Sequence, residues 1–210
     1  MNAFGVLWLA RAAAQVGAVF VHYGTDFVFA GDAERPYTED ASPNPRSFYA
    51  SSKLLGEWFA REAPRWYLLR VESLFGGSAL GSWHKSSVDL IADAIFEGRE
   101  AVVFSDRTVS PSFVVDVARA TRDIVERGTP YGLYHCVNSG LCTWYELARE
   151  IGRQLGIVPK LRLKSVAEVQ MRAARPRYCA LSNAKLAAAG ITMPSWQDAL
   201  ARYLAIRRSG

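Results

Sequence analysis

Three side chains near the N-terminus have the types and the spacing of a proton-transfer site. Tyr49 and Lys53 stand four residues apart in a helix-like run, so their side chains share one helix face and lie one turn apart. A phenol has an ordinary pKa of about 10, and a nearby ammonium group favours its ionised form. Tyr49 could therefore exchange a proton with a substrate carbonyl oxygen, which Thr25 would hold from the end of a β-like run. Lys53 would also bind a ribose, and the three residues together predict a hydride-transfer site. The alternative is that Tyr49 is a surface tyrosine that only packs on Lys53.

The elements that position these residues alternate in the manner of βα units. Helical patterns cover residues 4–16, 47–62, 86–97, 114–127, 143–155 and 196–206, and strand-like runs cover 18–23, 66–74, 101–104 and 132–137. Residues 26–44 form a loop too long for a plain connector, which makes it a candidate active-site loop. Alternating strands and helices predict an α/β fold with a doubly wound parallel sheet, whose ligands bind beyond the carboxyl ends of the strands.

Size and charge are those of an ordinary globular chain. The 210 residues are 50% hydrophobic and carry a formal net charge of +5, which allows one domain or one domain with a small lobe. Much of the positive charge lies in one stretch: Arg149, Arg153, Lys160, Arg162, Lys164, Arg172, Arg175 and Arg177. Such a stretch suits a phosphate-bearing ligand or is a solvated surface, and both interpretations stay open. Because no known nucleic-acid-binding motif accompanies this basic stretch, we expect no nucleic-acid partner.

The histidines and cysteines show no metal-site spacing. Cys136, Cys142 and Cys179 form no CxxC pair and are odd in number. That pattern argues against a disulfide framework and a zinc site, and it favours a reducing, cytoplasmic compartment. His22 and His135 occupy strand positions that favour packing over metal binding. Together these spacings lead us to expect no bound metal. The chain also has no apolar run of about 18 residues, so we expect no membrane span.

Several motifs resemble one enzyme family. The segments HYGTDFVFAG at 22–31, PYTED at 36–40, PNP at 43–45 and YASSKLLGE at 49–57 are similar to the core of the dTDP-4-dehydrorhamnose reductases. These are extended short-chain dehydrogenases/reductases. The similarity continues at 69–76, 106–116 and 185–196, so it covers nearly the whole chain. Its motifs are specific to this family rather than to dehydrogenases in general.

The resemblance implies roles for five residues. Thr25, Tyr49 and Lys53 would be catalytic, Tyr49 and Lys53 would contact the cofactor, and Thr25, Asp26 and Phe27 would contact the substrate. The implied reaction is the reduction, by NADPH or NADH, of a 4-keto group on a nucleotide-linked deoxysugar bound by a small C-terminal α/β lobe. Some relatives also bridge subunits with Mg²⁺, and the resemblance allows a homodimer.

This chain departs from the family pattern at a few positions. Gly24 replaces a serine that usually precedes the threonine, and Ala50 replaces a glycine that usually follows the tyrosine. Both replacements are small. Glu72 and Ser73 stand where many members carry a threonine-serine-tryptophan run near the substrate, which leaves the identity of the sugar open.

The dinucleotide-binding turn is missing from these residues. A doubly wound nucleotide-binding half begins with a strand, a glycine-rich turn and a helix that holds the pyrophosphate, but here a helix-like run leads directly to the Thr25 strand. We therefore expect an incomplete Rossmann-like fold that is truncated at the N-terminus and lacks its first βαβαβ half. Residues 1–77 would be the C-terminal half of the dinucleotide-binding domain and carry the catalytic residues. Residues 78–210 would be a mixed region, mainly the substrate-binding lobe, with strands and helices that return to the sheet. The isolated chain would expose an apolar edge, and we expect it to be inactive and poorly soluble or associated.

Two functions stay open at this point. The first is a reductase of the kind just described, which the presence of Thr25, Tyr49 and Lys53 favours. The second is a non-catalytic sugar-nucleotide-binding or regulatory subunit, similar to the reductase-like regulatory subunit of methionine adenosyltransferase. The missing glycine-rich turn favours this alternative.

Overall fold

A parallel sheet of three strands forms the centre of the structure, a computed structural model that describes residues 2–77, 81, 84–169 and 176–209. The strands follow the order β1 (Phe20–Thr25), β2 (Trp66–Val71) and β7 (Gly132–His135). Thr25 pairs with Val71, so β1 and β2 end at the same edge of the sheet. The expected α/β fold with a parallel sheet is confirmed.

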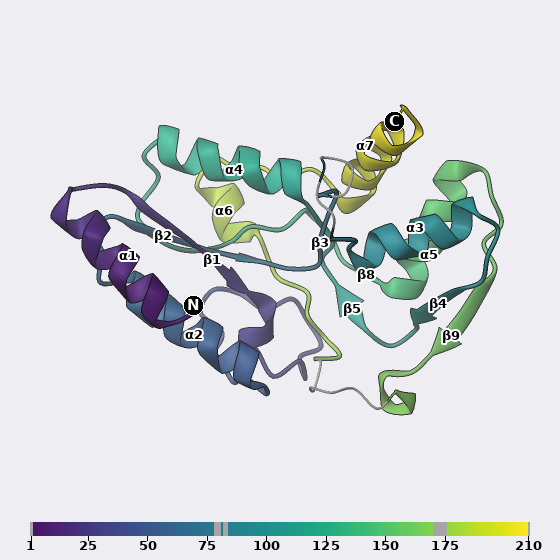
Figure 1. Ribbon diagram of the computed structural model, residues 1–210, viewed down its shortest axis with the longest axis horizontal. Coiled ribbons are helices and arrows are strands. Elements are labelled where there is room, and N and C mark those ends of the chain that lie inside the picture. Colours follow the sequence, from purple (N-terminus) through teal and green to yellow (C-terminus); the bar gives the residue numbers. More distant parts are fainter. Residues whose placement is uncertain (1, 78–80, 82–83, 170–175, 210) are drawn as a thin grey trace.

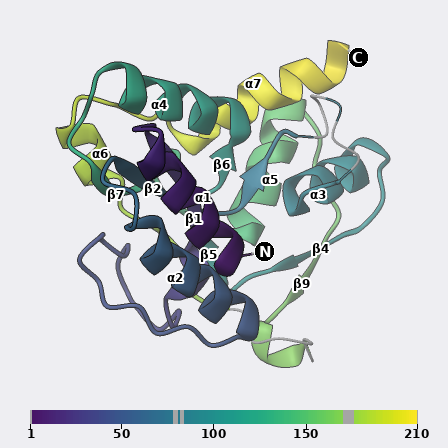
Figure 2. The same ribbon diagram turned by 60° about the vertical axis from the view of Figure 1, so that its left-hand side comes forward.

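Two pairs of helices cover the sheet. α1 (Phe4–Gln15) and α2 (Phe48–Ala60) lie on one face, and α4 (Val114–Glu126) and α6 (Ala184–Ala188) lie on the other (Figures 1 and 2). β2 is largely apolar because both of its faces are covered, and five of its six residues are buried. The first turn of α2 packs beside the 3₁₀ helix η1 (Asp26–Val28), which directly follows β1.

The second half of the chain contributes β7, α4 and α6 to the sheet and its cover, and the rest of its described elements form a lobe beside the sheet (Figure 1). Its elements are α3 (Ser87–Phe96), β4 (Ala101–Phe104), β5 (Thr108–Val109), β8 (Cys142–Thr143), α5 (Trp144–Leu155), β9 (Leu161–Lys164), η3 (Val166–Glu168) and α7 (Trp196–Ser209). β4 pairs with β9 in parallel, and β5 pairs with β8 antiparallel. Ser86 and Thr143 begin α3 and α5 with capping boxes, which satisfy free N–H groups of the first turns.

The prediction of one strand over residues 66–74 was wrong. β2 ends at Val71, and a separate short strand, β3 (Leu74–Phe75), pairs with β6 (Ser112–Phe113) of the lobe. The chain changes direction at Ser73, whose φ of 41° lies in the left-handed region that interrupts a strand. The sequence also did not indicate β9, because the charges of Arg162 and Lys164 conceal an edge strand.

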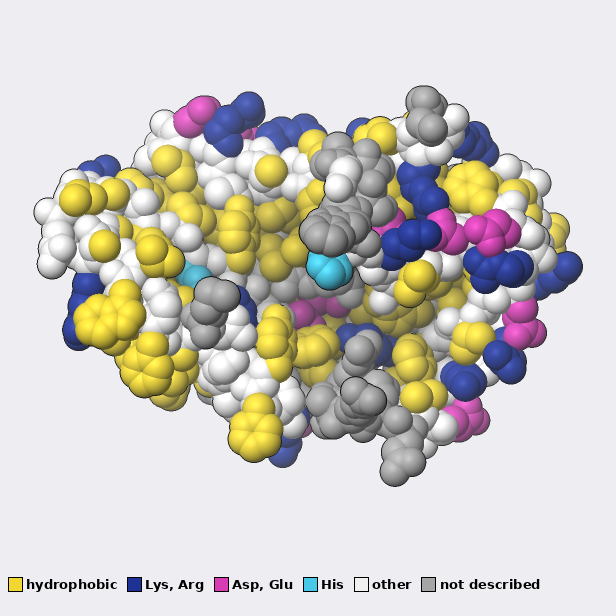
Figure 3. All heavy atoms as spheres, viewed as in Figure 1, with side chains coloured by type: hydrophobic (Ala, Val, Ile, Leu, Met, Phe, Trp, Pro, Cys, Tyr) yellow, Lys and Arg dark blue, Asp and Glu magenta, His cyan; other side chains and the backbone are white. Residues whose placement is uncertain are grey.

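β1 forms an edge of the sheet, and within the described ranges its strand partner is β2 alone. Beside it, α1 leaves Phe4, Trp8 and Leu9 exposed at 65%, 64% and 63%. Figure 3 shows hydrophobic side chains gathered on this side of the molecule, where Figure 1 places α1 and α2. This apolar surface and open edge match the expectation of an uncovered sheet edge and helix face.

None of the helices in the described part of the chain has the length and apolar character needed to cross a membrane.

Candidate active site

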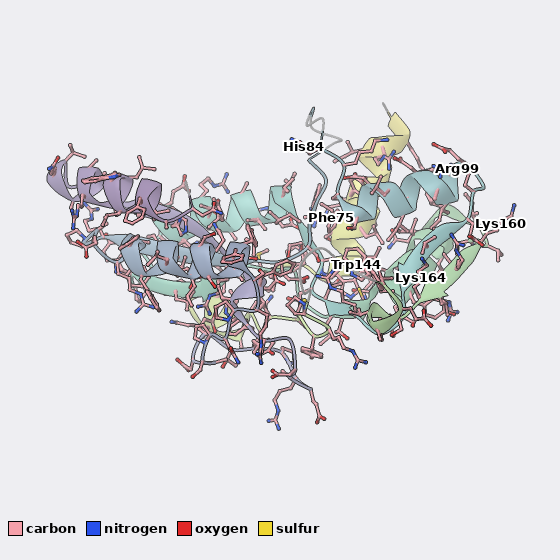
Figure 4. The ribbon with its side chains drawn as sticks, turned by 60° about the horizontal axis from the view of Figure 1, so that its bottom comes forward. Phe75, His84, Arg99, Trp144, Lys160 and Lys164 are labelled. Carbon is pink, nitrogen blue, oxygen red and sulfur yellow. The ribbon has the colours of Figure 1, made fainter. Side chains whose placement is uncertain are left out.

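A cavity of about 530 Å³ opens where the sheet meets the C-terminal lobe. It is lined by residues 23–27, 49, 53, 71–74, 85–88, 107 and 144. The walls therefore come from the ends of β1 and β2, from η1, from α2 and from the lobe. Figure 3 shows acidic side chains inside the hollow between the two halves, and Figure 4 shows Phe75 and Trp144 near this junction. The position beyond the carboxyl ends of parallel strands is the ligand position expected for such a sheet.

Thr25 ends β1 inside this cavity and is only 7% exposed. Its Oγ1 donates to Asp26 Oδ1 at 3.1 Å and accepts from the Phe27 N–H at 3.3 Å. The second bond caps η1, because the hydroxyl satisfies a free N–H group of the first turn. The Phe27 ring meets the Tyr49 ring edge-on, with ring centroids 6.0 Å apart. The structure thus brings Thr25, Asp26 and Phe27 together with Tyr49.

Tyr49 stands in the first turn of α2 and is half-exposed. Ser47 caps this helix by accepting from the Ala50 N–H at 3.2 Å. Burial raises the pKa of Tyr49, and the Asp26 charge adds to the rise, against a hydrogen bond with the Thr25 hydroxyl. The phenol is therefore protonated at neutral pH. This environment suits a proton donor, and it differs from the sequence-based picture of an ammonium that stabilises the phenolate.

Lys53 lies one turn further along α2 and points to the end of β1. Its Nζ donates to the Tyr23 carbonyl oxygen at 2.6 Å. Burial lowers the pKa of Lys53, and the Glu57 carboxylate one turn later opposes that effect. The ammonium group therefore lies in the cavity wall with Tyr49 and is held by a backbone carbonyl.

Asp26, Glu72 and Cys179 each place a donor atom within 4.8 Å of the other two, and all three are buried. Arg107 is buried beside them and donates to Cys179 Sγ at 3.7 Å and to the Pro176 carbonyl oxygen at 3.2 Å. A metal cation here would meet the guanidinium charge, so this donor set does not suit one. It also differs from the bridging glutamates that the family resemblance associates with Mg²⁺.

Sequence reasoning did not single out Lys85, Arg107 or Trp144 as site residues, although all three line the cavity. They come from three separate segments of the lobe, and only the packing of the lobe against the sheet brings them together. The Arg107 guanidinium lies 5.8 Å from the centre of the Phe27 ring. No local pattern could have found these residues, because their shared position is a property of the fold.

The described members of the basic stretch between residues 149 and 177 do not line this cavity. Three of its members form surface ion pairs, Arg153–Glu150 at 2.7 Å, Arg162–Glu100 at 3.0 Å and Arg177–Asp106 at 3.6 Å. Figure 4 shows Lys160 at the outer end of the lobe, near Arg99. Arg172 and Arg175 lie outside the described residues. The described members therefore favour the interpretation as a solvated surface.

The strand histidines are packed, as their positions indicated. Burial lowers the pKa of His22 to about 4 and that of His135 to about 3. His135 Nδ1 donates to the Tyr37 carbonyl oxygen at 3.1 Å. Cys136, Cys142 and Cys179 are free and buried.

Comparisons with known proteins match the chain along its length. The model of the family described as the RmlD substrate binding domain matches residues 1–209. The spore coat polysaccharide biosynthesis protein SpsK of Bacillus subtilis is 31% identical over 210 residues, which cover 100% of this chain and 72% of SpsK. The dTDP-4-dehydrorhamnose reductase of Mycobacterium tuberculosis is 36% identical over 217 residues, which cover 98% of this chain and 68% of that enzyme. The crystal structure of dTDP-4-dehydrorhamnose reductase from Bacillus anthracis in complex with NADP has a TM-score of 0.88 and 31% identity, and the match covers 98% and 72% of the two chains.

Proposed function

The chain belongs to the family of the RmlD substrate binding domain, and from this premise we propose that it acts in the NAD(P)H-dependent reduction of a 4-keto nucleotide-linked deoxysugar. The observation that carries the proposal is the convergence of Thr25, Tyr49 and Lys53 on one cavity. The relatives named as dTDP-4-dehydrorhamnose reductases and the NADP complex of one of them support this reaction class.

Each member of the trio has one task in this proposal. Tyr49 donates its phenol proton to the substrate oxygen, and burial supports that task by keeping the phenol protonated. Thr25 positions the same oxygen through its hydroxyl group. Lys53 holds a ribose hydroxyl with its ammonium group. A bound nicotinamide cofactor supplies the hydride that reduces the carbonyl carbon.

The sugar nucleotide would lie between the sheet and the lobe. Asp26 and Phe27 border the sheet side of the cavity, and Lys85, Ser86 and Trp144 border the lobe side. An ammonium group and a hydroxyl suit phosphate oxygens, and an aromatic ring suits a nucleobase. The structure thus offers chemistry for a nucleoside diphosphate opposite the catalytic trio.

We further propose that turnover requires a dinucleotide-binding half. The 210 residues contain no G-x-G-x-x-G turn, and the described residues fit only the nicotinamide-ribose end of the cofactor, through Tyr49 and Lys53. The open edge of β1 and the exposed apolar side of α1 are surfaces that such a half would cover.

The mass of the native polypeptide, with its oligomeric state, tests this requirement. The 210 residues account for 23.2 kDa, and a dinucleotide-binding half of about 80 to 90 residues adds roughly 9 kDa. A native chain of the larger mass supports the requirement. A native chain of 23.2 kDa that forms a homodimer through α1 and oxidises NADPH without a partner contradicts it.

Replacement of Tyr49 by Phe in the native protein tests the reductase assignment. We expect kcat to fall by about 10²- to 10⁴-fold, because a positioned general acid contributes about that much. The dissociation constant of the sugar nucleotide should stay within about threefold, because the phenol acts on the substrate mainly in the proton transfer. Tyr131→Phe is the matched control, since Tyr131 is 46% exposed against 49% for Tyr49 and lies outside the cavity. Full turnover by Tyr49→Phe contradicts the assignment.

A non-catalytic binding or regulatory subunit is the second candidate. The observation that favours it is the lack of a glycine-rich phosphate turn in the sequence. It predicts that the native protein binds a sugar nucleotide in the cavity and oxidises neither NADPH nor NADH. Isothermal titration with a dTDP-sugar, together with a cofactor oxidation assay on the same preparation, distinguishes the two functions.

A further inference from the structure

Two buried carboxyl groups lie in the wall of the cavity that Thr25 and Tyr49 line. Asp26 is 4% exposed and Glu72 is 2% exposed, and their carboxyl oxygens come within 4.8 Å of one another. Asp26 Oδ1 accepts the Thr25 hydroxyl, whereas Asp26 Oδ2 is buried and has no hydrogen-bond partner among the described residues. A buried acceptor without a donor costs about 1–3 kcal/mol. A protonated Glu72 carboxyl would provide the missing donor.

The backbone holds Glu72 in this position. The Ser73 hydroxyl donates to Glu72 Oε1 at 2.5 Å, and the Ser110 N–H donates to Glu72 Oε2. Ser73 is the one non-glycine residue of the described chain with a positive φ, at 41°. Such backbone strain persists only where the surrounding structure enforces it, and it concentrates at functional sites. The Glu72 carboxyl is therefore held beside Asp26 by the fold.

Burial, together with the closeness of the two carboxyl groups, favours one shared proton. Burial raises the pKa of Asp26 to about 6, and burial together with the Asp26 charge raises the pKa of Glu72 well above its ordinary value. Arg107 faces both carboxyl groups and opposes both shifts. Cys142 and Cys179 also face the pair, and burial raises their pKa values, so both thiols stay neutral. Both shifts favour a proton held by the pair, beside the Arg107 guanidinium group.

We propose that Asp26 and Glu72 hold one proton between them and pass it through the Thr25 hydroxyl to Tyr49, which restores the phenol after each turnover. Thr25 is the link, because its hydroxyl bonds to Asp26 and lines the same cavity as Tyr49. Asp26 and Glu72 act on the proton transfer only through Thr25 and Tyr49, so they are positioning residues for that step, while both also line the substrate cavity. The inference rests on the proposed reductase function.

The proton path balances at every step. An O–H bond forms at the substrate oxygen as the Tyr49 O–H bond breaks, which leaves a phenolate. The phenolate takes the Thr25 hydroxyl proton while Thr25 takes a proton from Asp26, which receives it from Glu72. A carboxyl rotation or one bridging water spans the distance between the two acids. The pair finally regains one proton from the solvent.

Infrared titration tests the shared proton without any turnover. At pH 7 we expect a carboxylic-acid carbonyl band in the native protein that disappears in Glu72→Gln. In Asp26→Asn the band should titrate away at a lower pH, because the Asp26 charge that raises the pKa of Glu72 is removed. Asp89→Asn is the control for the loss of a buried carboxylate, since Asp89 is 1% exposed and lies outside the cavity lining. An ionised Glu72 at pH 7 overturns the proposal.

Titration of the Tyr49 phenol tests the link to the acid pair. The ultraviolet difference between the native protein and Tyr49→Phe reports this phenol. Asp26→Asn should lower the pKa of Tyr49, because the Asp26 charge raises it, and Asp89→Asn should leave it unchanged. A Tyr49 titration that is identical in native protein and Asp26→Asn shows a merely structural pair and overturns the proposal.

Turnover provides the third readout. Glu72→Gln should lower kcat about tenfold at neutral pH, with the KM for the sugar nucleotide unchanged, and should steepen the loss of kcat at alkaline pH. A variant whose kcat and pH profile equal those of the native protein contradicts the relay. If the native protein does not oxidise cofactor while both titrations come out as expected, the proposed function fails and the proton-sharing pair stands.

Discussion

The buried ion pair between Glu57 and Arg70 joins the helix that carries Tyr49 and Lys53 to the centre of the sheet. Arg70 Nη2 donates to Glu57 Oε2 at 2.8 Å, and Arg70 Nε donates to both Glu57 oxygens at 3.1 and 3.3 Å. The two side chains are only 3% and 1% exposed. Glu57→Gln removes the carboxylate, keeps the side-chain shape and leaves the guanidinium charge buried.

The expected cost follows from that burial. Removing one member of a buried pair typically costs about 3–5 kcal/mol, because the remaining charge loses its counter-charge in a medium of low polarity. The Gln oxygen can still accept one hydrogen bond, so we expect the lower end, about 3 kcal/mol. That is a large part of a typical stability of about 5–15 kcal/mol. With a urea m-value of about 2 kcal/mol per M, the midpoint should fall by about 1.5 M.

Urea unfolding of the native protein, followed by circular dichroism, measures this change. Glu62→Gln is the matched control near the end of the same helix, because Glu62 pairs with Arg11 at 3.6 Å with both side chains about half exposed. We expect that control to cost less than about 1 kcal/mol. The double variant Glu57→Gln/Arg70→Met should lose less stability than the sum of the two single variants. A cost for Glu57→Gln no larger than that of Glu62→Gln refutes the reasoning.

Three further changes have clear expected outcomes. Gly31→Ala should destabilise the protein by at least about 1–3 kcal/mol in thermal unfolding, because φ is +82° and the new Cβ would lie 2.2 Å from Pro176 Cβ; an unchanged Tm contradicts the geometry. The pKa of His135 is lowered from 6.5 to about 3 in the folded protein, so the unfolded chain binds a proton at a higher pH than the folded protein does. The contribution of His135 to the free energy of unfolding is therefore fully present above about pH 6.5 and is lost as the pH falls toward 3. His135→Asn should flatten that acid dependence of the unfolding free energy, and an unaltered slope shows that His135 is not its source. The three cysteines are buried, so a thiol reagent should modify them only on unfolding, and rapid labelling of native protein contradicts their burial.

The parts of the fold that followed from the sequence are those with a local cause. The helical pattern over residues 47–62 indicated α2, whose observed bounds differ from the expected ones by one or two residues. Elements that depend on distant partners were less predictable. The run 66–74 divides at Ser73 because β3 pairs with β6 of the lobe rather than with the sheet. β9 forms because β4 lies beside it, which no pattern within its own four residues shows.

The same division applies to the site. The sequence by itself indicated Thr25, Tyr49 and Lys53 as the candidate site residues, because a strand end at Thr25 and a one-turn spacing of Tyr49 and Lys53 depend only on neighbours along the chain. Only the tertiary structure decided what those groups do electrostatically. Burial and the nearby Asp26 charge raise the pKa of Tyr49. Glu72 follows the end of β2 and comes to lie close to Asp26, which follows the end of β1. Desolvation and charge interactions depend on distances through space, and those distances are set when the lobe packs against the sheet.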